Sequence, residues 1–265
     1  MKSKISITIN EQTLAEIDSL IDNVYIRNRS QAIESLVRTS LGENKAAVIL
    51  AGGSESSLLL ADGQYRVTAR INSTTVIERT LRCLRSHGFK TVFVIARHKV
   101  LTKVFGLIKE GNDFGVKINY VEEKSSSGTA ASLRLLKGRV SSSFLVVYGD
   151  ILFDKINIDD LWNDHLKHNS IATIILTTSS KPSEKGTVRA DGNRVLEFTQ
   201  KPRHSDIYLV FSPIFVSSPE MMEYSGASLE KDVFPSLAQK GLLNGYLSSG
   251  RELHIHTLRD LQNAK

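Results

Sequence analysis

The sequence predicts an α/β protein built from two parts. In residues 4–10 apolar and polar side chains alternate, which is typical of a half-buried strand, and two helical patterns follow. From residue 46 onward, apolar segments alternate with amphipathic ones, an order typical of a mixed, mainly parallel sheet with helices on both faces. The linker LGENK separates the two patterns, so we predict domains at residues 1–43 and 46–265.

The composition is that of an ordinary globular protein, with 41% of the 265 residues hydrophobic and 23% charged. No run of 18 apolar residues occurs, the N-terminal MKSKISITIN lacks the apolar core of a signal peptide, and Cys83 is the single cysteine. We therefore expect a cytoplasmic protein without a membrane partner or a disulfide. The net charge of +6 is uneven, because residues 1–44 carry −1 and the remainder +7. That excess suits phosphorylated ligands or a nucleic-acid backbone, or is a solvated surface.

The N-terminal part reads as a strand followed by two helices, for which Asn10 and Ser30 are suitable N-caps. One amphipathic strand cannot close a core by itself, since both of its edges are unpaired and about forty residues rarely fold alone. Pairing the strand with its copy in a second chain would bury Ile5, Ile7 and Ile9. We therefore expect a homodimer through this part, and a higher oligomer stays open.

Residues 3–42 resemble the ribbon-helix-helix repressors, the class of Arc and MetJ, above all in the run NRSQAIESLVRTSL. In that family a two-stranded ribbon enters the DNA major groove and the start of the second helix grips phosphate, so the resemblance implies double-stranded DNA as a partner. The residues that it implies for DNA binding are Lys4, Ser6, Thr8, Arg29, Ser30 and Gln31. The alternative is a dimerisation module that does not touch DNA.

The larger part alternates strands and helices in a βαβ order. Its predicted strands cover 46–52, 91–97, 116–122, 143–150, 171–179 and 212–217. Its predicted helices cover 75–88, 99–111, 128–138 and 158–169, and a hairpin with Asp191-Gly192 at the turn covers 185–202. In such a sheet the ligand crevice lies at the carboxyl ends of the strands, where Gly52-Gly53 and Asp150 fall.

The order of these segments resembles the sugar-phosphate nucleotidyltransferases, over about residues 46–261. The matching motifs are VILAGG, SSGTAASL, VVYGD, VLEFTQKP and SLEKDVFPSLAQKG. The resemblance implies a Rossmann-like, glycosyltransferase-A-like fold and places a magnesium-binding aspartate at Asp150. The ligand-binding residues that it implies are Gly52, Gly53, Gly128, Thr129, Ala130, Asp150 and Lys201.

The chain departs from that family at positions that carry catalysis. The family's Gly-Gly-x-Gly-Thr-Arg loop reads Gly-Gly-Ser-Glu-Ser-Ser here, which replaces the arginine with Ser57 and adds the negative charge of Glu55. The family has two Lys-Pro pairs where this chain has Arg66-Val67 and Thr74-Thr75. The family's sugar-binding asparagine is replaced by Phe211, its second magnesium-binding aspartate by His254 and a glycine by His256. Because phosphoryl transfer depends on positive charge and metal, these losses predict that no catalytic residue and no metal site are retained.

Three hypotheses follow. The main one is a DNA-binding transcription regulator whose degenerate, pseudoenzyme domain senses a nucleotide, sugar phosphate or sugar nucleotide, without a cofactor. The second is a live nucleotidyltransferase that also binds DNA, with Mg²⁺ at Asp150. The third is a domain that binds nothing and sets oligomer geometry. The pair His254 and His256 could hold a transition metal, but the sequence favours a hydrogen-bonded or exposed pair, because no third ligand is nearby.

Overall fold

The computed structural model describes residues 5–21, 26–40, 45–125, 127–168 and 170–264. The chain divides into two compact units, Met1–Asn44 and Lys45–Lys265, which are described separately below.

The described part of the first unit contains two helices, α1 (Glu11–Ser19) and α2 (Arg29–Ser40). The Asn10 side chain caps α1 by accepting a hydrogen bond from the Thr13 amide at 2.8 Å. Asn28, and not Ser30, caps α2, because its side chain accepts from the Gln31 amide at 3.0 Å. The expected strand is absent from residues 5–10, so the ribbon-helix-helix fold is not shown.

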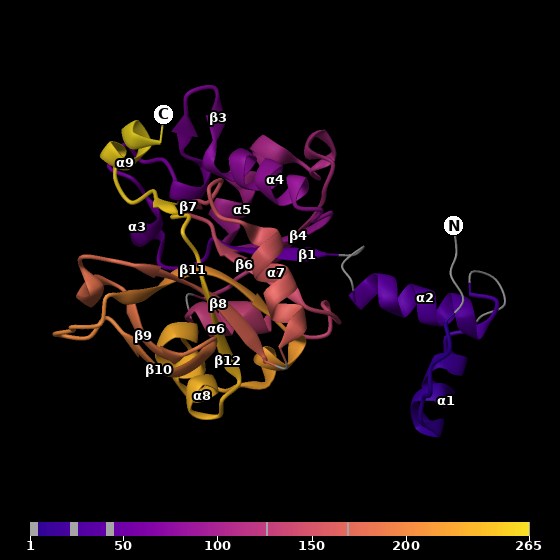
Figure 1. Ribbon diagram of the computed structural model, residues 1–265. Helices are drawn as coiled ribbons and strands as arrows, with labels where there is room; N and C mark the ends of the chain where they lie inside the picture. The colour runs from indigo at the N-terminus through magenta and orange to yellow at the C-terminus, as the bar shows by residue number, and fades with distance from the viewer. Residues whose placement is uncertain (1–4, 22–25, 41–44, 126, 169, 265) are drawn as a thin grey trace. The chain divides into compact units, whose positions relative to one another are not determined.

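The second unit is built on a nine-stranded sheet within the described residues (Figure 1). The strand order is β5-β4-β1-β6-β11-β8-β12-β10-β9. The bounds are β1 (Ala46–Leu50), β4 (Thr91–Ala96), β5 (Lys117–Glu122), β6 (Phe144–Tyr148), β8 (Ala172–Thr178), β9 (Gly186–Asp191), β10 (Arg194–Gln200), β11 (Leu209–Ser217) and β12 (Leu243–Leu247).

The sheet is mixed and mainly parallel, as the alternation of segments predicted. Strands β5, β4, β1 and β6 pair in parallel, and β12 pairs in parallel with β8. Among the described strands, β11 and β10 run against their neighbours, and β9 and β10 form the predicted hairpin. The order changes direction at β1, which has β4 on one side and β6 on the other, so a crevice is expected at their carboxyl ends.

Helices cover both faces of the sheet, which explains why β1, between β4 and β6, is apolar at every position. In β1, Ala47 and Ile49 face one core while Ala46, Val48 and Leu50 face the other. The first core is closed by α4 (Val76–Ser86), α5 (His98–Ile108) and α7 (Ile158–Lys167), and the second by α6 (Thr129–Arg134) and α8 (Phe234–Gln239). Figure 1 shows α4 and α5 on the opposite side of the sheet from α6 and α8.

Smaller elements complete the second unit. Strands β2 (Arg70–Ile71) and β3 (Thr74–Thr75) form one ribbon, and β7 (Ile151–Leu152) and β13 (Leu253–His254) another. The short helices are α3 (Glu55–Leu58), α9 (Leu258–Asn263), the 3-10 helices η1 (Arg66–Thr68), η2 (Asn112–Phe114), η3 (Pro182–Glu184) and η4 (Pro219–Glu223), and the π-helix η5 (Leu229–Val233). None of the helices in the described ranges has the length and apolar character needed to cross a bilayer.

Candidate functional site

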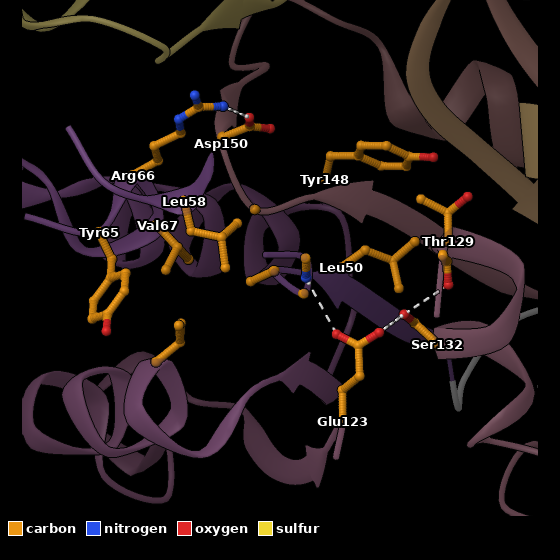
Figure 2. A pocket seen from close by; sticks show the side chains of 16 residues that line it. Leu50, Leu58, Tyr65, Arg66, Val67, Glu123, Thr129, Ser132, Tyr148 and Asp150 are labelled. Carbon is orange, nitrogen blue, oxygen red and sulfur yellow. Dashed lines mark hydrogen bonds and ion pairs between the residues drawn. The ribbon is translucent and has the colours of Figure 1, made fainter. Parts of the chain in front are cut away.

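A cavity lies at the carboxyl ends of β1 and β6 and encloses about 700 Å³, its solvent-open part included. Five of the residues expected to bind ligand line it: Gly52, Gly53, Gly128, Thr129 and Asp150 (Figure 2). The fold thus brings together segments that are about a hundred residues apart in the sequence.

The other two expected ligand residues lie elsewhere. Ala130 is buried and does not line the cavity, and its amide donates to the Ala227 carbonyl at 2.9 Å. Lys201 lines a second crevice, which shares Tyr148 and Asp150 with the first cavity. Two adjoining hollows with a common wall therefore occupy this edge of the sheet.

Glu123, which follows β5 directly, explains why the loop after β1 needs a glycine. Its carboxylate accepts hydrogen bonds from the Ser132 hydroxyl at 2.7 Å and from the Gly53 amide at 3.3 Å. A methyl group on Gly52 would overlap this carboxylate, so only glycine lets the loop pass so close to it.

The segment that contains Gly128, just before α6, is held in place by the loop before α8. Gly128 has a φ of +102°, and a methyl group there would overlap the carbonyl of Ala227. Next to it, the Thr129 hydroxyl donates to Glu230 at 2.8 Å and accepts from the Leu229 amide at 2.8 Å. The start of α6 is thereby fixed as one wall of the cavity.

The charge of Glu55 in the loop is compensated, contrary to the expectation that it would repel a triphosphate. Lys99 at the start of α5 pairs with Glu55 at 2.9 Å, and the Tyr65 hydroxyl donates to the same carboxylate at 3.1 Å. The hydrogen bonds from Lys99 and Tyr65 lower the pKa of Glu55, so it stays ionised and paired.

Asp150, which follows β6, lies beside an arginine and a histidine. The Arg66 guanidinium lies 3.2 Å from its carboxylate, and the His256 imidazole lies 3.3 Å from the same oxygen. Burial raises the pKa of Asp150, but the hydrogen bond from His256 and the charges of His256, His254 and Arg66 outweigh it and lower the pKa overall. The Arg66 Nε atom is buried without a partner among the described residues, whereas the side chain as a whole is 23% exposed.

These residues do not fit a magnesium ion, which the resembled family would hold here. Mg²⁺ prefers oxygen ligands in an octahedral arrangement, whereas the side chains paired with the Asp150 carboxylate are the Arg66 guanidinium and the His256 imidazole. Within the described part of the chain, no three His, Cys, Asp or Glu side chains form a group that could hold a metal. The imidazoles of His254 and His256 lie 5.3 Å apart, edge to face.

Two lysines, Lys185 and Lys201, and the imidazoles of His254 and His256 line the second crevice. Behind it, the buried Glu252 carboxylate binds Lys185 at 3.1 Å, His254 at 3.0 Å and the Ser212 hydroxyl at 2.8 Å. Burial raises the pKa of Glu252, but these partners outweigh it and lower the pKa to about 2. Glu252 therefore holds Lys185 and His254 in place as a permanent anion.

The structure describes five of the six residues expected to bind DNA. Lys4 lies outside the described residues, and Ser6, Thr8 and Ser30 are exposed. Arg29 is engaged by Asp18 at 2.6 Å. The Gln31 amide, expected to grip phosphate, is bonded to Asn28, and its side chain accepts from the Arg27 amide at 2.7 Å.

Several residues of the site were missed in the sequence. Glu123 carried a usable signal, since it follows the carboxyl end of a predicted parallel strand. Glu252 carried a second signal, because it lies two residues before His254 and residues two apart in a strand share a face. Lys99 carried no such signal, since its partner Glu55 is 44 residues away.

Residues 46–260 match the family model described as nucleotidyl transferase. The chain belongs to the nucleotidyl transferase family. It is 26% identical over 210 residues to the mannose-1-phosphate guanylyltransferase catalytic subunit beta of Drosophila pseudoobscura pseudoobscura, covering 76% of this chain and 56% of that protein. It is 25% identical over 224 residues to the mannose-1-phosphate guanyltransferase of Aspergillus oryzae, covering 81% and 61% respectively. The chain thus spans little more than half the length of these relatives.

The fold of this nucleotidyl transferase family member recurs in a solved structure of a Bacillus anthracis protein assigned as glucose-1-phosphate thymidylyltransferase. The TM-score is 0.74, with 19% sequence identity, and the match covers 83% of this chain and 93% of that one. At this identity the likeness shows the fold alone, which agrees with the α/β nucleotidyltransferase fold predicted from the sequence.

The hypothesis of a DNA-binding transcription regulator was wrong. The family is one of sugar-phosphate nucleotidyltransferases, and the curated relatives are named as such enzymes. The prediction had relied on substituted loop residues and on an N-terminal resemblance. The described N-terminal residues form no ribbon, and Arg29 and the Gln31 amide already have partners within the chain.

Proposed function

We propose that this chain is a sugar-phosphate nucleotidyltransferase, which joins the nucleoside monophosphate part of a nucleoside triphosphate to a sugar 1-phosphate. The observation that carries this proposal is the shared wall of the two hollows, formed by Tyr148 and Asp150. A nucleotide in the first cavity and a sugar phosphate in the second crevice would meet at this wall. The names of the relatives support the same pair of substrates.

The reaction requires only that two phosphorus groups be brought into line. An oxygen of the sugar 1-phosphate attacks the α-phosphorus and forms a new P–O bond. The bond from the α-phosphorus to the oxygen bridging the β-phosphate breaks, and pyrophosphate leaves with the electron pair. Since the protein does little covalent work here, catalysis depends on positioning and on positive charge.

Cationic groups stand on both sides of the shared wall. Arg66 lines the nucleotide cavity, and its partly exposed guanidinium is oriented by Asp150. Lys185 and Lys201 line the sugar-phosphate crevice, and Lys185 is fixed by Glu252. Arginine suits this task because its planar guanidinium binds phosphate oxygens through several donors.

The test is pyrophosphate release by the full chain, with each common nucleoside triphosphate paired with mannose 1-phosphate or glucose 1-phosphate. Separate reactions contain Mg²⁺, Mn²⁺ or EDTA. We expect release that requires both substrates, near or above the 1 s⁻¹ at the low end of ordinary enzymes. Arg66→Ala should lower it by roughly 100-fold, as loss of one charge-stabilising donor commonly does.

Asp150→Asn tests the role of Asp150, and Asp113→Asn is its matched control. Asp113 is exposed on η2, before the amino end of β5, whereas the crevice lies at the carboxyl ends of the strands. We expect Asp113→Asn to behave as wild type and Asp150→Asn to lose activity. Absence of release with every substrate pair and metal condition, from protein that binds triphosphate, would show that the chain is not a transferase.

A further inference from the structure

A row of paired side chains lies along the wall that the two hollows share. On the cavity side, Arg66 Nη1 lies 3.2 Å from Asp150 Oδ2, and Figure 2 shows the guanidinium directed at this carboxylate. His256 Nε2 lies 3.3 Å from the same oxygen. On the crevice side, the His254 ring packs edge to face against His256, and its Nε2 lies 3.0 Å from Glu252. The Asp150 carboxylate therefore has two partners within the chain.

The backbone places both partners beside Asp150. Strand β7 begins directly after Asp150 and pairs with β13. The amide of Ile255, which follows β13, donates to the Asp150 carbonyl at 2.8 Å, and this bond sets His256 next to the carboxylate. On the other side, Arg66 is the first residue of η1, a turn that the buried Val67 anchors. The pairing at Asp150 is thus a product of the fold of this chain.

A divalent cation would have to compete with these partners for Asp150. Mg²⁺ loses its water reluctantly and is usually held by carboxylates together with substrate phosphates. At Oδ2 it would displace the Arg66 and His256 contacts, and at Oδ1 it would lie next to a guanidinium that stays positively charged. His254, at the position of the second carboxylate of the resembled family, is bound to Glu252 and offers an imidazole, which suits zinc or copper better than magnesium. This wall therefore disfavours a metal bridge between Asp150 and a ligand.

Arg66 can supply positive charge at the same place. Its side chain lines the cavity and is 23% exposed, so the guanidinium can reach a ligand there. A guanidinium has several N–H donors, more than its contact with Asp150 uses, and it binds phosphate oxygens in the plane of its fork. Pairing with a carboxylate also restricts this long side chain, which lowers the entropy lost when a ligand binds. The pairing with Asp150 therefore favours phosphate binding by Arg66.

From this geometry we infer that Arg66, held by Asp150, takes the place of a protein-bound divalent cation, so that the chain binds a nucleoside triphosphate without a metal bridge to the protein. Asp150 is then a positioning residue that acts through Arg66. The inference rests on the proposed function in one respect, namely that the cavity is the triphosphate site. Two competing roles for Asp150 are a metal ligand and a purely structural anion, and each predicts a different response to metal and to substitution.

The first test is calorimetric titration of the wild-type full chain with GTP, ATP, CTP and UTP, in buffer with Mg²⁺ and in buffer with EDTA. For the triphosphate that binds most tightly, we expect binding in EDTA and a gain in affinity from Mg²⁺ of less than about fivefold. Binding that is detected only with Mg²⁺, or a larger gain from it, would overturn the inference. This comparison needs no substitution, so it decides even if a variant fails to fold.

The second test compares Asp150→Asn with Asp154→Asn in the same two buffers. Asp154 is exposed and pairs with Arg79 at 2.5 Å, which makes it a matched control for loss of an aspartate charge beside an arginine. We expect Asp150→Asn to weaken triphosphate binding about tenfold in both buffers, because Arg66 loses a charge-assisted partner. Asp154→Asn should bind as wild type does. A loss in Asp150→Asn that is confined to the Mg²⁺ buffer would identify a metal ligand and overturn the inference.

The third test repeats Asp150→Asn in a chain that also carries Arg66→Ala, with titration in EDTA. A positioning residue acts through Arg66, so the second substitution should weaken binding by less than about twofold in this background. An equal loss with and without Arg66 would assign Asp150 a purely structural role and refute positioning. Thermal melting of each variant checks that the fold is retained.

Failure of the inference and failure of the proposed function give different results. Pyrophosphate release, together with triphosphate binding that requires Mg²⁺ and Asp150, would overturn the inference alone. Binding in EDTA that depends on Arg66 and Asp150, without pyrophosphate release in any condition, would support the inference and remove only the transfer reaction. If no triphosphate bound in either buffer, both would be wrong.

Discussion

At the scale of single residues, the site depends on a close approach between a glycine and a carboxylate. Gly52→Ala would push a methyl group into the Glu123 carboxylate and displace it from Ser132. We expect a loss of about 1–3 kcal/mol in the free energy of unfolding, the cost of disturbing a buried hydrogen-bonded group, together with weaker triphosphate binding. Urea unfolding and titration measure the two effects.

The control for this substitution is Gly106→Ala in α5. No atom lies within 4 Å of a methyl group placed at Gly106, and the residue is helical. Because alanine favours helix over glycine, Gly106→Ala should stabilise the protein by up to about 1 kcal/mol. A Gly52→Ala protein as stable as wild type, with unchanged binding, would contradict the described loop geometry.

A buried histidine sets a pH dependence of stability. His165 lies in the core, where its ring nitrogens face Thr173 at 3.0 Å and Ser143 at 3.4 Å. Burial, with a smaller effect of the His168 charge, lowers the pKa of His165 from 6.5 to about 4. The folded state therefore favours the neutral ring. Its contribution is complete above about pH 6.5 and is lost as the pH falls toward 4, by about 3 kcal/mol at most.

Urea unfolding at pH 7, 6, 5 and 4 measures this dependence. His165→Gln should remove most of the difference between pH 6.5 and 4 that the wild type shows. His168→Gln, which changes an exposed histidine at the end of the same helix, should retain most of it. Identical pH profiles for wild type and His165→Gln would contradict a neutral buried ring.

At the scale of elements, the loop helix α3 is tied to α5 by the ion pair of Glu55 and Lys99. Lys99→Ala would release the Glu55 charge beside the nucleotide cavity. We expect triphosphate affinity to fall roughly two- to fivefold at low salt, and less at high salt because the repulsion is screened. Stability should not change measurably, since the pair is exposed.

Lys103→Ala, one turn further along α5 and exposed, is the control for this change in net charge. It should leave triphosphate affinity nearly unchanged. The proposed tie between α3 and α5 would be refuted if both variants weakened binding equally at every salt concentration.

The N-terminal segment presents apolar side chains that one chain leaves exposed. Ile5 and Ile7 are 76% and 53% exposed, and Leu36 and Val37 each exceed 40%. A second copy of the segment would cover them, so we still predict a homodimer through the first unit. Light scattering at micromolar concentration should give a dimer for wild type and Thr8→Lys, and a monomer for Ile7→Lys. A monomeric wild type would show that this pairing does not occur.

At the scale of the whole molecule, the two units should be separable. None of the three hydrophobic clusters in residues 45–265 includes a described residue of the first unit. We therefore expect a fragment of residues 45–265 to melt within about 2 °C of the full chain and to keep its triphosphate affinity. A fragment that is unfolded at 25 °C would show that the first unit contributes to the stability of the second.

Much of the fold was determined by the sequence alone, because the deciding signals are local. Apolar runs in the predicted strands specified the α/β order, and the turn at Asp191-Gly192 specified the hairpin. The motifs at Gly52-Gly53 and Asp150 specified the family and the edge of the sheet at which the site lies. These features need only neighbouring residues, or the rule that parallel strands end at one edge.

Only the tertiary structure decided how the side chains of the site are paired. From the sequence, Glu55 was interpreted as an uncompensated negative charge, whereas the fold pairs it with Lys99. Arg66 was interpreted as the replacement of a catalytic lysine, whereas the fold pairs it with Asp150. Glu123 belongs to the site because its carboxylate accepts a hydrogen bond from the amide of Gly53, seventy residues away in the sequence. Electrostatic and hydrogen-bonding roles depend on distances between segments remote in sequence, so pattern and composition could not supply them.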